Sequence, residues 1–151
     1  MSSDLFKAIL AMDAYNRGYK PGIEGLSEAP GTKLGNATIL DSKGDVEAQS
    51  AGFYAIAYKL ANGETVISYR GTDEVVNWKL WDDRSGDLWE AWTIGGGNVE
   101  AKQATLAFEF YNAVKTTPGV NAENISLTGH SSGGGLAGLA NDGLLLTETA
   151  A

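Results

Sequence analysis

The sequence contains no cysteine and only one histidine, His130. Without cysteine there is no disulfide, no thiolate metal site and no cysteine nucleophile, and the redox compartment stays open. A single imidazole disfavours a transition-metal enzyme, because most zinc and non-haem iron sites use two or more histidines together with carboxylates. No calcium-binding loop pattern is present either. We therefore expect neither a metal nor another cofactor.

Positive charge and long apolar runs are also scarce. The chain has 11 lysines and arginines against 19 aspartates and glutamates, with a net charge of -8. Because the basic residues are scattered, nucleic acid is not expected as a partner. The longest apolar run, 51–58, is far shorter than the roughly 20 residues that cross a membrane. The N-terminus, with an acid ahead of its first lysine, does not resemble a signal peptide, which leaves a cytoplasmic protein and one secreted by another route both open.

The remaining composition is that of a globular domain, with 43% hydrophobic residues over 151 positions. We expect one domain over 1–151. Apolar residues at helical spacing predict a helix over 3–17 that Gly18 ends. A second helix is predicted over 99–115, with Asn98 as its N-cap and Leu106, Phe110 and Val114 on one face.

Strands are predicted near 37–40, over 52–60 and 65–69, and as a short buried strand over 125–128. A turn at 41–45 follows the first of these, and a tight turn at 61–64 joins the second to the third. From residue 65 onward, strands and helices alternate, which is typical of parallel strands joined by crossover helices. We expect an α/β fold with three layers.

The fourth strand leads into Gly129-His130-Ser131-Ser132-Gly133, which fits the G-x-S-x-G pattern of a nucleophile elbow. In such an elbow a serine lies on a tight turn between a strand and a helix. The residues two before and two after the serine come into contact, so glycine is needed at both places. The small residues that follow predict a helix whose N-terminus favours a developing oxyanion.

These glycines have two other interpretations. The stretch could be a flexible glycine loop without a catalytic serine. Alternatively, residues 133–138 fit G-x-G-x-x-G, the pattern of a dinucleotide site. That pattern is disfavoured because four residues separate it from the strand and Glu148 does not match the acid expected about 20 residues later.

Two motifs resemble the class 3 lipases, the group that includes the fungal triacylglycerol lipases. GHSSGGGLAG at 129–138 is similar to the family's GHSLGGALA. VISYRGTDEVVNW at 66–78 is similar to its strand, Arg-Gly-Ser/Thr segment and Asn-Trp pair. The resemblance covers about 52–140 and implies the N-terminal portion of an α/β-hydrolase that cleaves carboxylic esters, as a triacylglycerol lipase or carboxylesterase. Lipid or small ester substrates, and transient contact with a lipid surface, follow from it.

The resemblance also implies roles for single residues. Ser131 would be the nucleophile that forms an acyl-enzyme. Thr72 and Ser132 would supply oxyanion donors from their backbone N–H groups. Trp78 and Trp81 lie where the family's lid begins and would shield an acyl pocket, although ordinary core packing is an equally good interpretation of either tryptophan.

The same comparison gives non-catalytic roles to three further residues. Arg70 and Asp73 would pair near the oxyanion loop, which is a structural task. His130 precedes the serine, as its equivalent does in the family, and is not the base there. Ser132 itself departs from the family, which usually has leucine at this position.

The family's catalytic acid and histidine have no counterparts after Ser131. Glu148 near a strand end is a weak substitute for the acid, and His130 from a second subunit a weak substitute for the base. We expect instead that the chain is the N-terminal part of a longer hydrolase, with an incomplete sheet that exposes an edge. Self-association or pairing with a complementary chain is expected from that edge. The alternative function is a noncatalytic assembly or binding module that keeps the lipase-like core.

Overall fold

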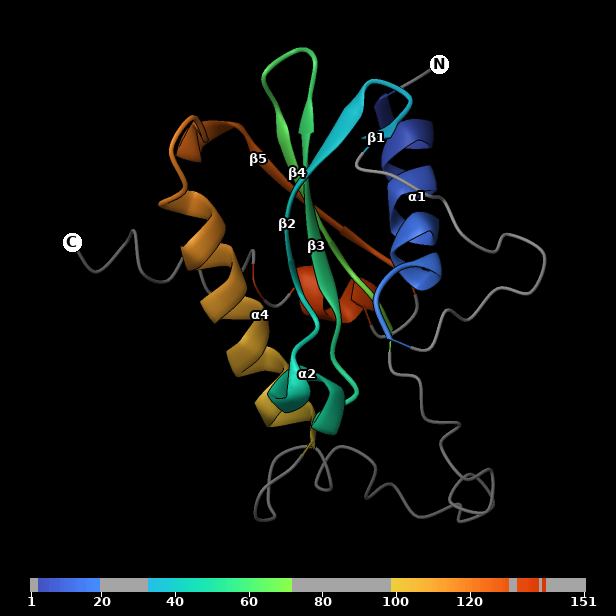
Figure 1. Cartoon of the computed structure of the whole chain (residues 1–151), viewed down its shortest axis with the longest axis vertical. Coiled ribbons are helices and arrows are strands. Elements are labelled where there is room, and N and C mark those ends of the chain that lie inside the picture. Colours follow the sequence, from blue (N-terminus) through green and yellow to red (C-terminus); the bar gives the residue numbers. More distant parts are fainter. Residues whose placement is uncertain (1–2, 20–32, 72–98, 131–132, 139, 141–151) are drawn as a thin grey trace.

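The computed structural model describes residues 3–19, 33–71, 99–130, 133–138 and 140 (Figure 1). Its helices are α1 (Ser3–Asp13), α2 (Val46–Ser50) and α4 (Val99–Lys115), with short 3-10 helices η1 (Ala14–Asn16) and η3 (Ala122–Asn124). Its strands are β1 (Lys33–Leu34), β2 (Ala37–Lys43), β3 (Ala55–Leu60), β4 (Thr65–Tyr69) and β5 (Ile125–Gly129). Residues 133–138 and 140 are helical.

The five strands form one mixed sheet in the order β1-β2-β3-β4-β5. The first three pairs are antiparallel, and β5 runs parallel to β4. A parallel neighbour needs a crossover connection, and α4 lies in the connection between β4 and β5. The predicted α/β fold is confirmed, with its parallel part limited to the last pair of strands.

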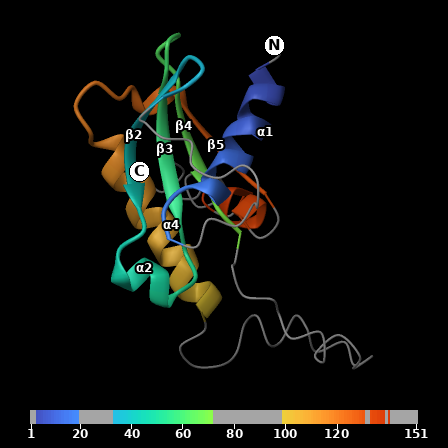
Figure 2. The same ribbon diagram turned by 45° about the vertical axis from the view of Figure 1, so that its right-hand side comes forward.

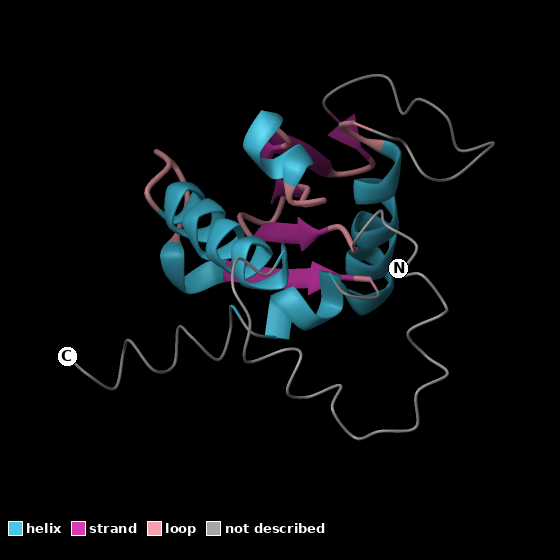
Figure 3. Ribbon diagram, turned by 90° about the horizontal axis from the view of Figure 1, so that it is seen from below, coloured by secondary structure: helices cyan, strands magenta, loops and turns pink. Residues whose placement is uncertain are grey.

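Helices cover both faces of the sheet, with α1 on one side and α4 with α2 on the other (Figures 1 and 3). Successive side chains of a strand point to opposite faces. In β3 and β4 they therefore divide between two buried clusters. One packs toward α4 and contains Ala57, Ile67, Tyr69, Leu106, Phe110 and Val114, and the other packs toward α1 and contains Leu10, Ala14, Ile56, Tyr58 and Val66. The two cores thus separate three layers, with helix α1 on one side of the sheet and helices α2 and α4 on the other (Figure 1).

Several elements agree with the sequence patterns. The helix predicted over 99–115 has those bounds, and its three predicted core residues, Leu106, Phe110 and Val114, are buried. The turn at 61–64 joins β3 to β4 with Gly63 at φ 88°, a conformation that glycine adopts without strain. Gly18 ends the first helical segment with φ 76°.

Other predicted bounds were wrong. The helix predicted over 3–17 ends at Asp13 and tightens into η1. The turn predicted at 41–45 is not there, because β2 continues to Lys43 in its pairing with β3. Strand β3 begins at Ala55 rather than at residue 52. Neither β1 nor α2 was predicted, although Asp45 caps α2 by accepting a hydrogen bond from the Ala48 N–H at 2.9 Å.

Strand β5 is one residue longer than predicted and only half-buried along its whole length. It was expected to be a buried strand. Among the described strands it pairs only with β4, so one of its edges faces away from the sheet. Within the part of the chain that the structure describes, no helix is long and apolar enough to cross a membrane.

A polar cluster joins α1 to β5 and to Glu64, which directly precedes β4. The ammonium of Lys7 lies 2.7 Å from the Glu64 carboxylate and donates a hydrogen bond to the Ser126 hydroxyl at 3.0 Å. Ser126 in turn donates to Glu64 at 2.5 Å. The hydrogen bond from Lys7, which has the largest effect, and the one from Ser126 hold the pKa of the Glu64 carboxyl below its ordinary value of 4.5. The cluster therefore stabilises the carboxylate form of Glu64.

Stability should depend on pH through this carboxylate. Because its pKa is lower in the folded chain, its contribution is present above pH 4.5 and is lost as the pH falls through the folded-state pKa. We expect Glu64→Gln to lower the free energy of unfolding at neutral pH by about 1–3 kcal/mol, and the deficit to shrink in acid. Urea unfolding measured at several pH values checks this.

Glu47→Gln is the matched control for this experiment. Glu47 faces Lys102 at 3.6 Å with both side chains about half exposed, so its loss should change stability by less than about 1 kcal/mol. A deficit of Glu64→Gln that stays constant from neutral to acid pH would contradict the role given to its carboxylate.

Candidate active site

The C-terminal ends of α1, β4 and β5 meet at one end of the sheet (Figures 1 and 2). Strand β4 ends at Tyr69 and continues into Arg70 and Gly71, and β5 ends at Gly129 and continues into His130. Catalytic groups commonly lie on the loops beyond the carboxyl ends of parallel strands. This end of the sheet is therefore where the predicted site residues would gather.

The chain turns back on itself directly after β5. The Gly133 N–H donates to the His130 carbonyl at 3.1 Å, and helical residues follow from 133. A Cβ atom on Gly129 would lie 2.3 Å from the carbonyl carbon and oxygen of Gly133. Contacts this close to backbone atoms leave no room for a side chain. The two glycines that flank the serine pattern thus touch one another, as the elbow requires.

The same turn is pressed against the end of β4. A Cβ atom on Gly133 would lie 2.1 Å from the Tyr69 carbonyl oxygen. By contrast, a Cβ atom on Gly135 or Gly138 would meet nothing within 4 Å. Only some glycines of this stretch are therefore required by packing, which favours a built turn over a flexible glycine loop.

The segment after α1 reaches the same place. The Tyr15 hydroxyl donates to the His130 carbonyl at 3.1 Å and accepts a hydrogen bond from the Gly71 N–H at 3.0 Å. The imidazole Nδ1 of His130 lies 3.4 Å from the same hydroxyl oxygen. The two rings meet edge to face, with centroids 5.7 Å apart. A single phenol thus contacts the chain just after β4 and just after β5.

Arg70, which follows β4, is almost completely buried, with 1% of its surface exposed. Its guanidinium donates to the carbonyls of Arg17 and Tyr19 at 3.2 and 2.8 Å. It also lies over the rings of Tyr19 and Tyr54, 4.6 and 5.0 Å from their centroids. These contacts give Arg70 a structural role, because they fasten the residues after α1 to the end of β4. The pairing predicted with Asp73 lies outside the described residues.

Burial also fixes the protonation of the last residue of β4. It raises the pKa of the Tyr69 phenol, which stays neutral and donates to the Ala107 carbonyl of α4 at 3.1 Å. The strand end that supports the turn is thereby joined to the helix that covers its other side.

The residues predicted to carry the chemistry lie outside the described residues: these are Ser131, Ser132, Thr72, Trp78 and Trp81, and the same holds for Asp73, Asn98 and Glu148. Their immediate neighbours are described. Gly71 precedes Thr72, His130 precedes Ser131 and Gly133 follows Ser132. The structure brings these three neighbours together from strands β4 and β5.

Tyr15 was not predicted to belong to this site. Its partners are backbone atoms 56 and 115 positions away in the sequence. Nothing in the residue types around an aromatic side chain signals such partners. The sequence signal nearest to Tyr15 is the pair Asp13 and Arg17, opposite charges four positions apart that form an ion pair at 2.5 Å. This spacing indicates that the segment is ordered.

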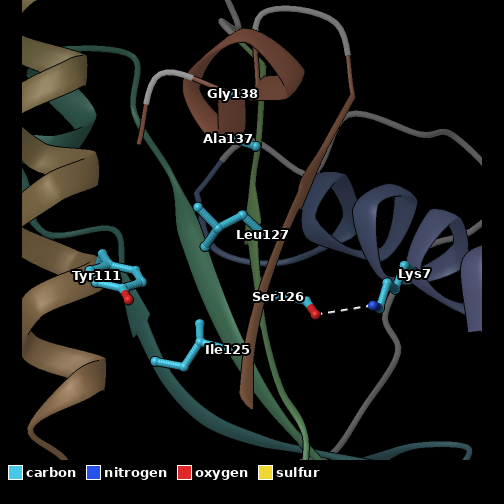
Figure 4. Close-up of a pocket in the computed structure, with 7 residues that line it drawn as sticks. All are labelled: Lys7, Tyr111, Ile125, Ser126, Leu127, Ala137 and Gly138. Carbon is cyan, nitrogen blue, oxygen red and sulfur yellow. Dashed lines mark hydrogen bonds between the residues drawn. The ribbon is translucent and has the colours of Figure 1, made fainter. Parts of the chain in front are cut away.

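Two hollows flank β5. The larger, about 470 Å³, lies at its outer edge, where Ile125 and Leu127 point toward Tyr111 of α4 and Ser126 points toward Lys7 of α1 (Figure 4). The smaller, about 310 Å³, lies between α1 and the end of β5 and includes His130. His130, which lines the smaller hollow, directly precedes the predicted nucleophile in the sequence. Across the described ranges, no three histidine, aspartate or glutamate side chains gather as a metal site would require.

A tight glycine-flanked turn after a parallel strand is the place where α/β-hydrolases carry their nucleophile. The model of the Phospholipase-like family, described as the Tle-like phospholipase domain, matches residues 6–142. The match covers most of the chain, which therefore belongs to the Tle-like phospholipase domain family. Neither the search of curated proteins nor that of solved structures found a match.

The family match supports a lipase- or phospholipase-like protein and hydrolase activity in general. It does not support the class 3 lipases in particular, the family that the two motifs resemble. The expected relationship is therefore confirmed at the level of lipid ester hydrolases.

The contact between Gly133 and β4 predicts a large difference between two glycine substitutions. Gly133→Ala places a Cβ atom against the Tyr69 carbonyl, and we expect it to lower the free energy of unfolding by about 1–3 kcal/mol. Gly135→Ala is the matched control, because open space surrounds that position and alanine favours a helix by about 0.5–1 kcal/mol. Chemical unfolding of both variants checks this. Equal stability of the two would contradict the tight turn.

Proposed function

We propose that the chain is a lipid ester hydrolase that acts through Ser131. The observation that carries the proposal is the mutual contact of Gly129 and Gly133, which flank the serine, at the end of a strand parallel to β4. Such a turn exposes the residue at its centre, and a serine there is available to a substrate. Membership of a phospholipase family supports the same chemistry.

In the proposed reaction the Ser131 hydroxyl oxygen attacks the carbonyl carbon of the ester, and its proton passes to a general base. The carbonyl oxygen becomes an oxyanion that accepts hydrogen bonds from the backbone N–H groups of Thr72 and Ser132. Collapse of this intermediate breaks the ester bond, releases the alcohol with a proton from the base, and leaves an acyl-enzyme. Water then attacks the acyl carbon, which frees the acid and restores the serine.

The proposed substrates are phospholipids or other acyl esters, with Trp78 and Trp81 shielding the acyl chain. Contact with a lipid surface is supported by α1, where Leu5, Ile9 and Met12 are exposed. Their spacing places them on one face of the helix. Met12 also lines the hollow that includes His130, so the apolar face continues toward the end of β5.

The mechanism needs a general base that accepts the serine proton. The sequence has one histidine, His130, which directly precedes the serine and lies against Tyr15. Neighbours on a tight turn point in different directions, so His130 is poorly placed to take the proton from Ser131 of the same chain. This observation favours a second candidate function, a noncatalytic module that keeps the hydrolase framework and binds or assembles through it.

A fluorophosphonate probe separates the two functions. If Ser131 is activated, we expect one probe per chain by intact mass, loss of labelling in Ser131→Ala, and hydrolysis of phospholipid vesicles that the same variant abolishes. Ser132→Ala is the matched control, because it keeps the backbone N–H proposed as an oxyanion donor and should still be labelled. No labelling of the folded protein would exclude the serine mechanism and favour the noncatalytic module.

The outer edge of β5 supports the proposed self-association. In the described part of the chain this edge has no strand beside it, and the side chains of β5 are half-buried. An unpaired edge presents N–H and C=O groups that can pair with another strand. We expect two copies to pair there, so that sedimentation gives a mass above the monomer's 15.9 kDa. A monomer at every concentration would contradict pairing through β5.

A further inference from the structure

We propose that Tyr15 is a positioning residue for the serine reaction, an inference that rests on the proposed function. Its hydroxyl joins Gly71, which precedes the proposed oxyanion donor Thr72, to His130, which precedes the proposed nucleophile Ser131. A nucleophile and its oxyanion donors must keep a fixed separation, because a displacement of about 1 Å can cost about 100-fold in rate. Tyr15 fixes the two chain segments on which that separation depends.

The hydrogen-bonding capacity of a phenol matches this position. The hydroxyl has one proton and two lone pairs. Its proton is donated to the His130 carbonyl, and one lone pair accepts the Gly71 N–H. The hydroxyl oxygen also lies 3.4 Å from His130 Nδ1, which can donate to its second lone pair when that nitrogen carries the proton. One oxygen thus bonds to backbone groups beyond two different strand ends and lies close to the His130 ring.

The Gly71 N–H has a particular need for this partner. Gly71 is buried, and a buried N–H without an acceptor is costly. Gly71 lies just beyond the β4 ladder, where Arg70 still donates its N–H to the Tyr54 carbonyl at 2.9 Å. The acceptor for the next N–H comes from the Tyr15 side chain. Removal of the phenol oxygen would therefore release the chain one residue before Thr72.

The residues before and after Tyr15 in the sequence are anchored to the sheet. Asp13 pairs with Arg17 at 2.5 Å and accepts a hydrogen bond from the buried Tyr58 hydroxyl of β3 at 2.7 Å. The carbonyls of Arg17 and Tyr19 accept the bonds from Arg70 described above. The segment that carries the phenol is thus fastened to β3 and β4, so Tyr15 can transmit their position to the two strand ends.

The test compares Tyr15→Phe with Tyr19→Phe at saturating fluorophosphonate. Tyr15→Phe keeps the ring against His130 and removes only the hydroxyl. Tyr19→Phe removes a comparable bond, from its hydroxyl to the Phe53 carbonyl at 2.8 Å, away from the turn. We expect the maximal labelling rate constant to fall about 10- to 100-fold in Tyr15→Phe alone, with the half-saturating probe concentration unchanged. Amide exchange of Gly71 should also become faster in that variant alone.

Each other result overturns a distinct claim. Labelling of Tyr15→Phe at the wild-type rate, or an equal loss in both variants, would contradict the positioning role while the proposed function stands. Unchanged exchange of the Gly71 amide would contradict the hydrogen bond on which the role depends. Absence of labelling in the wild-type chain would contradict the proposed function itself, and the role of Tyr15 with it.

Discussion

The close approach of Gly133 to the Tyr69 carbonyl is the constraint on which the rest of this site depends. It requires that β5 end beside β4, that the chain turn within the few residues after Gly129, and that no side chain intervene at either glycine. The parallel pairing of the two strands supplies the first condition, and α4 makes that pairing possible as the crossover. The place of the turn thus follows from backbone packing, and side-chain contacts of Tyr15 and Arg70 hold the segments beside it.

The two apolar cores determine where strand β4 and therefore this turn lie, and polar contacts of Arg70 and Tyr15 hold the turn there. Apolar residues of β3 and β4 alternate between α4 and α1, so the strand that supports the turn is buried on both faces. Buried Arg70 then ties the end of that strand to the residues after α1, and Tyr15 ties the same residues to β5. An N-terminal helix that is remote in sequence from the serine pattern therefore becomes part of its surroundings.

The sequence predicted the elements with a strong local signal. Helix α4 has apolar residues at helical spacing and a Pro118-Gly119 stop, and the turn after β3 carries Asn-Gly, so both were predicted with their bounds. The turn propensity of Asp41 and Ser42 predicts a turn at the polar end of β2, but pairing with β3, a tertiary contact, outweighs it. Tyr15 was missed because its partners are distant backbone atoms. The roles of Ser131, Thr72 and Ser132 stay predictions.

The most direct test of the account is the structure of the chain after phosphonylation by a fluorophosphonate. The account predicts a single modified residue, Ser131, with a phosphoryl oxygen within hydrogen-bonding distance of the backbone N–H groups of Thr72 and Ser132, and with Tyr15 still joining Gly71 to His130. A phosphoryl oxygen that points away from both N–H groups, or a modified residue other than Ser131, would contradict it.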